Sequence, residues 1–141
     1  MGEQRLIRRL HAYWDAKCSK RPYPSLDDIE VGEIADLWPH CFVLDAASQQ
    51  TPYFLYLGPE LARYTGVFLS GEQSWSQTLL DKAVDRFHEA LDARRPVVTE
   101  DTVQLYDGSR LLYRSVLLPL GDNDSQINFL LGAANGQLVN A

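Results

Sequence analysis

The chain has 141 residues, of which 45% are hydrophobic and 23% are charged, and its formal net charge is −6. This length and composition are typical of one globular domain that folds without disulfides or a bound metal. The negative charge argues against general nucleic-acid binding, because proteins of that class neutralise phosphates with a basic surface.

The first predicted element is an amphipathic helix over residues 3–17. Its apolar side chains recur every three or four positions and form one stripe, which contains Leu6, Ile7, Leu10, Tyr13 and Trp14. A polar stretch closed by two prolines follows, so we divide the chain into an N-terminal helix with its linker (1–23) and a main domain (24–141). Ser25 then has the pattern of a helix N-cap, with an acidic residue three positions later, and a short helix or two helical turns are predicted over residues 29–38.

Two strands are predicted next, over residues 40–45 and 53–57, with a polar connection between them. In the first strand, alternation puts Phe42 on one face of the sheet and puts Cys41 and Val43 on the other. These two strands are expected to pair as a hairpin.

The middle of the chain is predicted to be helical, with a passage over residues 58–71 and a long helix over residues 76–95 that Pro96 ends. Three more strands follow, over residues 97–105, 110–118 and 127–134. The first two of these are joined through Asp107-Gly108, a strong hairpin signal. Strands at both ends of a helical middle predict an α+β fold, with one antiparallel five-stranded sheet, helices across one face and an added N-terminal helix.

Four stretches of the sequence have the order and spacing of one known family. They are Tyr13-Trp14, residues 24–34, residues 37–45, and Leu117 to Gly121 followed by Leu130-Leu131-Gly132. Together they resemble a proteobacterial family of small, often stand-alone PAS-like domains, the fifth PAS family of domain catalogues. The resemblance implies a five-stranded antiparallel sheet and a sensory or regulatory role through binding, and it supplies no catalytic residues.

Two positions depart from the family pattern. Val31-Gly32 occupies a place where members often have a proline, and the strand over residues 53–57 lacks the arginine that many members carry. If that arginine engages a ligand in other members, this chain binds a different ligand or none.

PAS domains place their pocket near the sheet and the middle helices, so the resemblance implies a ligand site there. Aromatic side chains from the second strand, the middle of the chain and the fourth strand are expected to gather around it. The candidate ligand-binding residues are Tyr56 (with Tyr53 as its alternative), Tyr64, Trp75, Tyr113 and Arg114. Such a set suits a pocket, but aromatic residues in a small domain also form a plain core, and a surface ion pair also explains Arg114.

The sequence argues against three kinds of bound group. His88 lies off the apolar stripe of its helix, so haem ligation is not expected there. No cysteine lies between Gly58 and Arg95, which argues against the flavin–thiol adduct of light-sensing PAS domains. The acidic residues 27–36 lack the ligand spacing of a calcium loop, so no metal is expected. Haem and flavin are therefore not predicted, and the cofactor is unknown.

The apolar stripe of the first helix has two explanations. The resemblance implies that such helices lie at dimer interfaces, which makes Leu6, Leu10, Tyr13 and Trp14 the candidate interface of a homodimer. Packing of this helix against the chain's own sheet explains the same stripe.

The location of the protein is predicted from what the sequence lacks. Cys18 and Cys41 have no metal-binding spacing and indicate free thiols. There is no secretory signal and no apolar run long enough to span a membrane, so we expect a cytoplasmic protein.

These observations predict a non-catalytic sensory or regulatory module of bacterial signal transduction, which binds a small molecule or a protein partner. One alternative is a structural adaptor or dimerisation domain with a filled core. Another is a small isomerase or dehydratase, for which His40 and Asp45 are the one acid–base pair we nominate. These two residues are predicted to face opposite sides of one strand, which argues against catalysis.

Overall fold

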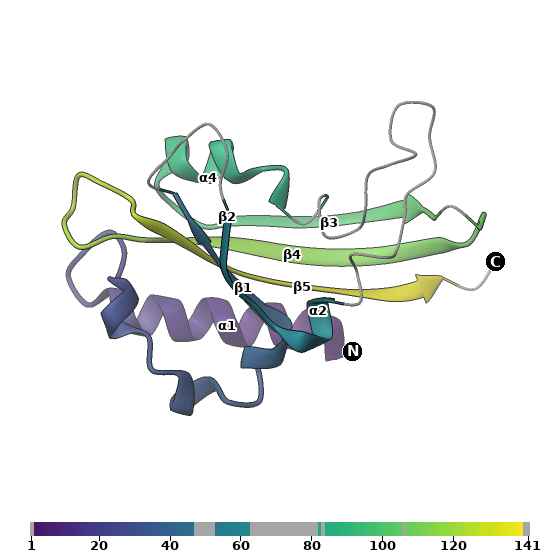
Figure 1. Cartoon of the computed structure of the whole chain (residues 1–141), viewed down its shortest axis with the longest axis horizontal. Coiled ribbons are helices and arrows are strands. Elements are labelled where there is room, and N and C mark those ends of the chain that lie inside the picture. Colours follow the sequence, from purple (N-terminus) through teal and green to yellow (C-terminus); the bar gives the residue numbers. More distant parts are fainter. Residues whose placement is uncertain (1, 47–52, 63–81, 83, 106, 140–141) are drawn as a thin grey trace.

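The computed structural model describes the chain over residues 2–46, 53–62, 82, 84–105 and 107–139 (Figure 1). The helices and strands within these residues are α1 (Gly2–Cys18), β1 (Cys41–Asp45), β2 (Tyr53–Leu57), α2 (Pro59–Ala62), α4 (Phe87–Ala93), β3 (Val97–Gln104), β4 (Arg110–Leu120) and β5 (Phe129–Val139). Three 3-10 helices connect α1 to β1, namely η1 (Leu26–Asp28), η2 (Val31–Ile34) and η3 (Trp38–His40).

The five strands form one antiparallel sheet in the order β2-β1-β5-β4-β3. The last strand in the sequence, β5, lies at the centre of the sheet between the first strand, β1, and β4. The predicted hairpin between β3 and β4 is present and turns at Gly108, whose φ of +90° suits glycine. The α+β prediction is therefore confirmed.

Each face of the sheet carries its own hydrophobic core. The outer face, which we define as the side covered by α1 and the 3-10 helices, holds a cluster that includes Leu10, Trp14 and Val116. The inner face, on the side of α2 and α4, holds a second cluster that includes Phe42 and Tyr113. α1 and α4 accordingly lie on opposite sides of the sheet (Figure 1).

The helix α1 belongs to the outer core. Leu6, Leu10 and Trp14 are buried, and the Trp14 indole Nε1–H donates a hydrogen bond to Pro119 O at 2.8 Å. Tyr13, the remaining candidate interface residue, is half-buried and packs against the same core. The stripe is therefore explained by packing within the chain, and the apolar patch on which the expected dimer interface rested is covered. The boundary predicted between residues 23 and 24 therefore separates residues that pack together in the outer core.

The long helix predicted over residues 76–95 is not continuous in its described part. Asp85 and Arg86 form a turn, and α4 begins directly after them. Arg86 has non-helical angles of φ −96° and ψ 21°, and its guanidinium donates to Thr99 Oγ1 on β3 at 2.7 Å. A side-chain bond to the sheet thus accompanies the interruption of the helix.

The helical passage predicted over residues 58–71 is described in its first part, where α2 forms. Residues 63–81, with the candidates Tyr64 and Trp75, lie outside the described residues. Within the ranges that the structure describes, no helix has the length and apolar character needed to cross a membrane.

Candidate functional site

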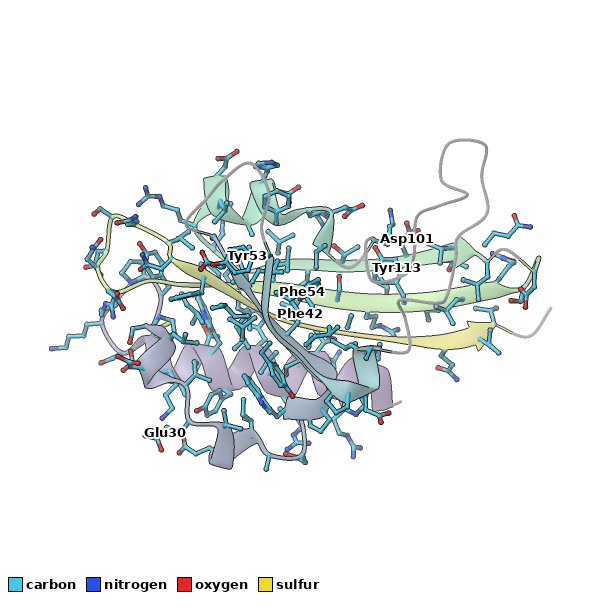
Figure 2. The ribbon with its side chains drawn as sticks, in the orientation of Figure 1. Glu30, Phe42, Tyr53, Phe54, Asp101 and Tyr113 are labelled. Atoms are coloured by element: carbon cyan, nitrogen blue, oxygen red, sulfur yellow. The ribbon has the colours of Figure 1, made fainter. Side chains whose placement is uncertain are left out.

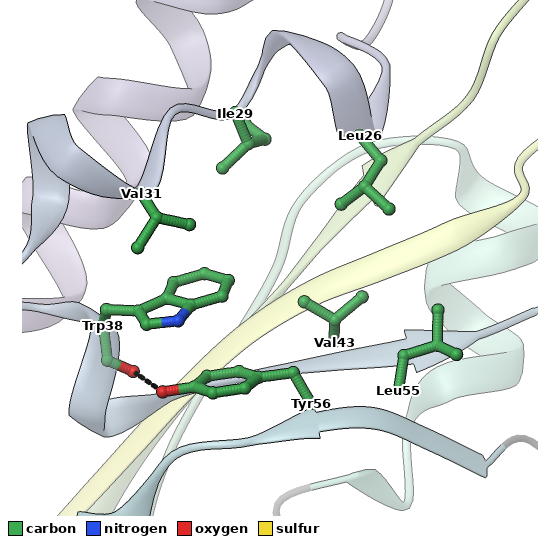
Figure 3. A pocket seen from close by; sticks show the side chains of 7 residues that line it. All are labelled: Leu26, Ile29, Val31, Trp38, Val43, Leu55 and Tyr56. Atoms are coloured by element: carbon green, nitrogen blue, oxygen red, sulfur yellow. Dashed lines mark hydrogen bonds between the residues drawn. The ribbon is translucent and has the colours of Figure 1, made fainter.

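A pocket of about 260 Å³ lies on the outer face beside the edge strand β2 (Figure 3). Its lining comes from the η1–η2 segment, from η3, and from strands β1 and β2. The lining residues are Leu26, Ile29, Val31, Trp38, Val43, Leu55 and Tyr56. All except Trp38 and Tyr56 are aliphatic, so the pocket favours apolar groups.

Two stacked aromatic rings form one wall of the pocket. The ring centroids of Trp38 and Tyr56 are 4.3 Å apart, and the ring planes differ by 10°. The Tyr56 hydroxyl donates a hydrogen bond to Trp38 O at 3.0 Å, which joins β2 to η3 (Figure 3). Burial raises the pKa of the Tyr56 phenol, so the proton stays on its oxygen at neutral pH. This wall therefore offers aromatic faces rather than a charge.

A β-bulge directs two neighbouring residues of β2 toward the pocket. Val43 pairs with Tyr56 and Leu44 pairs with Phe54, so Leu55 is an extra residue without a partner on β1. In a regular strand Leu55 and Tyr56 would face opposite sides of the sheet. Here both line the pocket, and the side chain of Leu55 lies at its exposed margin.

Contacts from α1 hold the 3-10 side of the pocket. The Tyr13 hydroxyl accepts a hydrogen bond from Glu30 N–H at 2.8 Å and lies 2.9 Å from Glu33 Oε1. Hydrogen bonds to Glu33 from Lys17 and then from Tyr13 hold the pKa of that carboxyl below its ordinary value. Because Glu30 lies between two lining residues, its backbone bond to Tyr13 fixes the segment that carries them.

The predicted N-cap is present at the start of η1. Ser25 N–H donates a hydrogen bond to Asp28 Oδ2 at 2.9 Å, as a capping pair requires. That bond is the main reason why the pKa of Asp28 lies below its ordinary value. The cap fixes the first turn of η1 and with it the lining residue Leu26.

The candidate ligand-binding residues do not gather in one place. Tyr56 lines the outer pocket, whereas Tyr113 is buried in the inner core. The strand register explains the separation, because residues that pair across strands lie on the same face of the sheet. The residues that pair in this way across β2, β1, β5 and β4 are Tyr56, Val43, Leu131 and Leu118. Tyr113 lies an odd number of positions from Leu118 on the same strand and so faces the other side. The expectation that these two aromatic residues share one pocket is wrong.

Tyr113 and Arg114 both have partners within the fold. Burial, followed by the charges of Asp85 and Asp101, raises the pKa of Tyr113 to about 12. Asp101 is the cross-strand neighbour of Tyr113 (Figure 2). Arg114 forms an ion pair with Glu100 on β3, with 3.0 Å between Nε and Oε2. The ion pair weighed as the alternative for Arg114 is therefore present.

Sequence reasoning found Tyr56 and missed the other lining residues. Alternation assigned Val43 to the face opposite Phe42, and this was a usable signal once the pocket was placed on that face. Trp38 lies in one of the four stretches that resemble the family, but the resemblance gave it no role in a pocket. Leu55 had no signal, since an uninterrupted apolar strand gives no sign of a bulge.

Neither cysteine lies in the inner core. Cys41 is buried in the outer core, where its Sγ–H donates to Leu37 O at 3.3 Å and burial raises its pKa to about 12. Cys18 packs against the same core. His88 is exposed on α4, with its ring centroid 3.9 Å from that of Phe87. Among the described residues, no three metal-ligating side chains form a group.

Comparison with known proteins supports the fold. A family model described as PAS domain matches residues 3–135. Two solved structures of light-oxygen-voltage (LOV) domains are similar. A domain studied with a flavin analogue has 16% identity and a TM-score of 0.49, over 78% of this chain and 84% of the other. The dark structure of the blue-light photoreceptor Aureochrome1 LOV has 15% identity and a TM-score of 0.50, over 79% and 84%.

No curated protein matches the chain. At 15% identity, the likeness to the Aureochrome1 LOV structure shows the fold alone. The flavin chemistry named for those proteins is therefore not transferred to this chain.

Proposed function

The chain belongs to the PAS domain family, a family of sensory modules, and from this premise we propose that it acts by binding rather than by catalysis. The site we propose is the outer-face pocket lined by Trp38, Leu55 and Tyr56. Its volume of about 260 Å³ is below the roughly 300 Å³ at which pockets for drug-sized ligands begin. It therefore suits a small apolar group, such as an aliphatic chain or a single aromatic ring.

The observation that carries this proposal is the preformed stack of Trp38 on Tyr56. The two rings are already held together by the hydrogen bond between the Tyr56 hydroxyl and Trp38 O. A preformed apolar wall binds a ligand without the cost of ordering side chains first. Leu55 and Val31 are both exposed, so the pocket can be entered from solvent.

The chemistry around the pocket supports binding without turnover. Acid–base and nucleophilic catalysis need a group that ionises near neutral pH. Tyr56 is the one ionisable residue of the lining, and burial raises its pKa. Cys41, also in the outer core, has a pKa raised to about 12, and its thiol donates a hydrogen bond to the backbone carbonyl of Leu37. Asp45, from the enzyme alternative, accepts a hydrogen bond from Tyr53 at the sheet edge.

We expect neither haem nor flavin as the cofactor. A flavin–thiol adduct requires a cysteine in the middle helical passage, and neither Cys18 nor Cys41 belongs to that part of the sequence; both pack on the outer core. The exposed His88 has its ring beside Phe87 on the surface of α4, which does not suit an axial haem ligand. We also expect the protein to act in the cytoplasm, where its two free thiols stay reduced, and to pass its signal to a protein partner.

A titration followed by NMR tests this function, with indole and cyclohexanol as small apolar probes. Shifts are expected for the backbone amides of residues 26–31 and 55–56. Leu55→Arg places a long charged side chain at the exposed margin of the pocket and should weaken probe binding by at least about tenfold. Leu138→Arg is the matched control, because Leu138 is 61% exposed on β5 and does not line the pocket. Equal affinity in all three proteins, or no binding, would contradict the proposal and favour an adaptor with a filled core.

A further inference from the structure

One backbone edge of the described sheet is open at β2. This strand lies at one end of the strand order, and its residues Tyr53, Phe54 and Leu55 are 55%, 36% and 50% exposed. Consecutive strand residues face opposite sides of a sheet, so exposure of all three shows that side chains on both faces of this edge strand meet solvent. The strand sequence contains no charged residue and no proline, which are the usual protections of a free edge.

The opposite edge of the same sheet has such protection. On β3, Glu100 forms an ion pair with Arg114 across the strands, and Asp101 is an exposed neighbouring charge. Charged side chains on an edge strand discourage pairing with another chain. The β3 edge is thus protected by charges, whereas the β2 edge is apolar. This difference favours a binding function for the β2 edge.

The pocket adjoins this open edge through Leu55 and Tyr56, which both line it. We propose that β2 and the pocket together bind an extended segment of a partner protein. The segment adds to the sheet as a further strand, and one of its large apolar side chains enters the pocket. This inference rests on the proposed function, because it names the partner of the same pocket.

The backbone geometry of β2 supports strand addition. Gly58 N–H donates to Cys41 O at 2.8 Å, and the next pair along the strands is Leu57 with Phe42. In antiparallel strands, pairs that exchange hydrogen bonds alternate with pairs that do not. Gly58 and Cys41 form a pair of the bonded kind, so the next pair, Leu57 with Phe42, is of the kind that exchanges no hydrogen bonds. The N–H and C=O of Leu57 therefore point away from β1, in the direction from which an added strand would pair.

The charges around the pocket favour a basic segment. The η1–η2 region carries five exposed carboxylates, which belong to Asp27, Asp28, Glu30, Glu33 and Asp36. Three of these have basic partners within the chain. In the described part of the chain, Asp27 and Glu30 form no ion pair, and each is the sequence neighbour of a lining residue. Figure 2 shows Glu30 at the surface of this region. Lysine or arginine beside the apolar anchor of a partner would pair with these two carboxylates.

A second copy of this chain fits the edge less well than a basic segment. Pairing of two β2 edges would bring the same carboxylates of both copies to one interface, in molecules that each carry a net charge of −6. Like charges across an interface oppose association. The charge of the region therefore selects a partner of opposite sign.

Synthetic peptides and the full chain provide the test, with affinity measured by fluorescence anisotropy at low and high salt. The first peptide has one tryptophan between valine and threonine residues and lysines at both ends. The second has glutamates in place of the lysines, and the third keeps the lysines but has N-methylated backbone amides that cannot pair with a strand. We expect the first peptide to bind, more weakly at high salt, and the other two to bind at least about tenfold more weakly.

Two pairs of protein variants locate the binding site. Leu55→Arg should weaken binding of the lysine peptide by at least about tenfold, while Leu138→Arg leaves it unchanged. Glu30→Gln should weaken it by about threefold, as expected for a peripheral charge pair. Asp92→Asn, which removes an exposed carboxylate on α4, should have no effect.

Equal binding of the N-methylated peptide would overturn strand addition, and equal or tighter binding of the glutamate peptide would overturn the choice of a basic partner. A homodimer that peptide cannot displace would place a second copy at the edge and would also overturn the inference. Indole binding without peptide binding would overturn the inference and leave the proposed function in place. If the protein binds neither indole nor the lysine peptide, the proposed function itself is overturned.

Discussion

The Tyr56 side chain joins three parts of the molecule, because it belongs to β2, stacks on Trp38 of η3 and lines the pocket. Its hydroxyl stabilises the fold, since it donates a hydrogen bond to the Trp38 carbonyl. Its ring face is left for the pocket. The same residue thus contributes to stability and to binding through different atoms.

Tyr56→Phe separates these two contributions. The variant loses the hydrogen bond to Trp38 O and should lower the free energy of unfolding by about 1 kcal/mol, while apolar probes still bind. Urea unfolding measures the change. Tyr53→Phe is the control, because the Tyr53 hydroxyl bonds to Asp45 at an exposed site and its loss should have no measurable effect. Equal losses in the two variants would contradict the role assigned to the Tyr56 hydroxyl.

Stability should also fall at alkaline pH because of Cys41 and Tyr113. Burial raises the pKa of Cys41 from 9.0 to about 12 and that of Tyr113 from 10.0 to about 12. A raised pKa in the folded state stabilises the protein at pH values below the unfolded pKa, and this stabilisation is lost as the pH rises toward the folded pKa. We expect a loss on the order of 2 kcal/mol between about pH 8 and pH 10.5. Cys41→Ala should lose less over the same range, and an unchanged loss would contradict the assignment.

At the scale of elements, short irregular segments rather than the long helix build the pocket. The bulge at Leu55 changes which side chains face outward, and the capped η1 and anchored η2 cover the sheet beside it. Alternation along β1 and the cap at Ser25 are local patterns, so the sequence predicted both. The bulge and the path of the 3-10 helices depend on tertiary contacts such as the bond from Glu30 N–H to Tyr13, and no local pattern encodes those.

The role of α1 leads to a prediction about Leu10. This side chain is fully buried against the outer core, so Leu10→Ala should lower the free energy of unfolding by about 2–5 kcal/mol. The sedimentation coefficient of the folded variant should not change, because the stripe packs within the chain. A small stability loss together with a change in oligomeric state would instead support the dimer interface expected from the resemblance.

At the scale of the whole molecule, the sheet separates two environments. The inner face carries the core around Tyr113, and the outer face carries α1 and the pocket. The sequence predicted the strands and the fold class, because these follow from alternation, turns and element order. It did not predict that Tyr56 and Tyr113 lie on opposite faces, because this depends on the pairing register of strands that are distant in sequence.

A crystal structure of the protein with indole bound tests the outer pocket most directly. We expect the indole ring in that pocket, against the Trp38–Tyr56 stack and between Val31 and Leu55. Indole bound on the inner face beside Tyr113, with none in the outer pocket, would instead place the binding site on the inner side of the sheet.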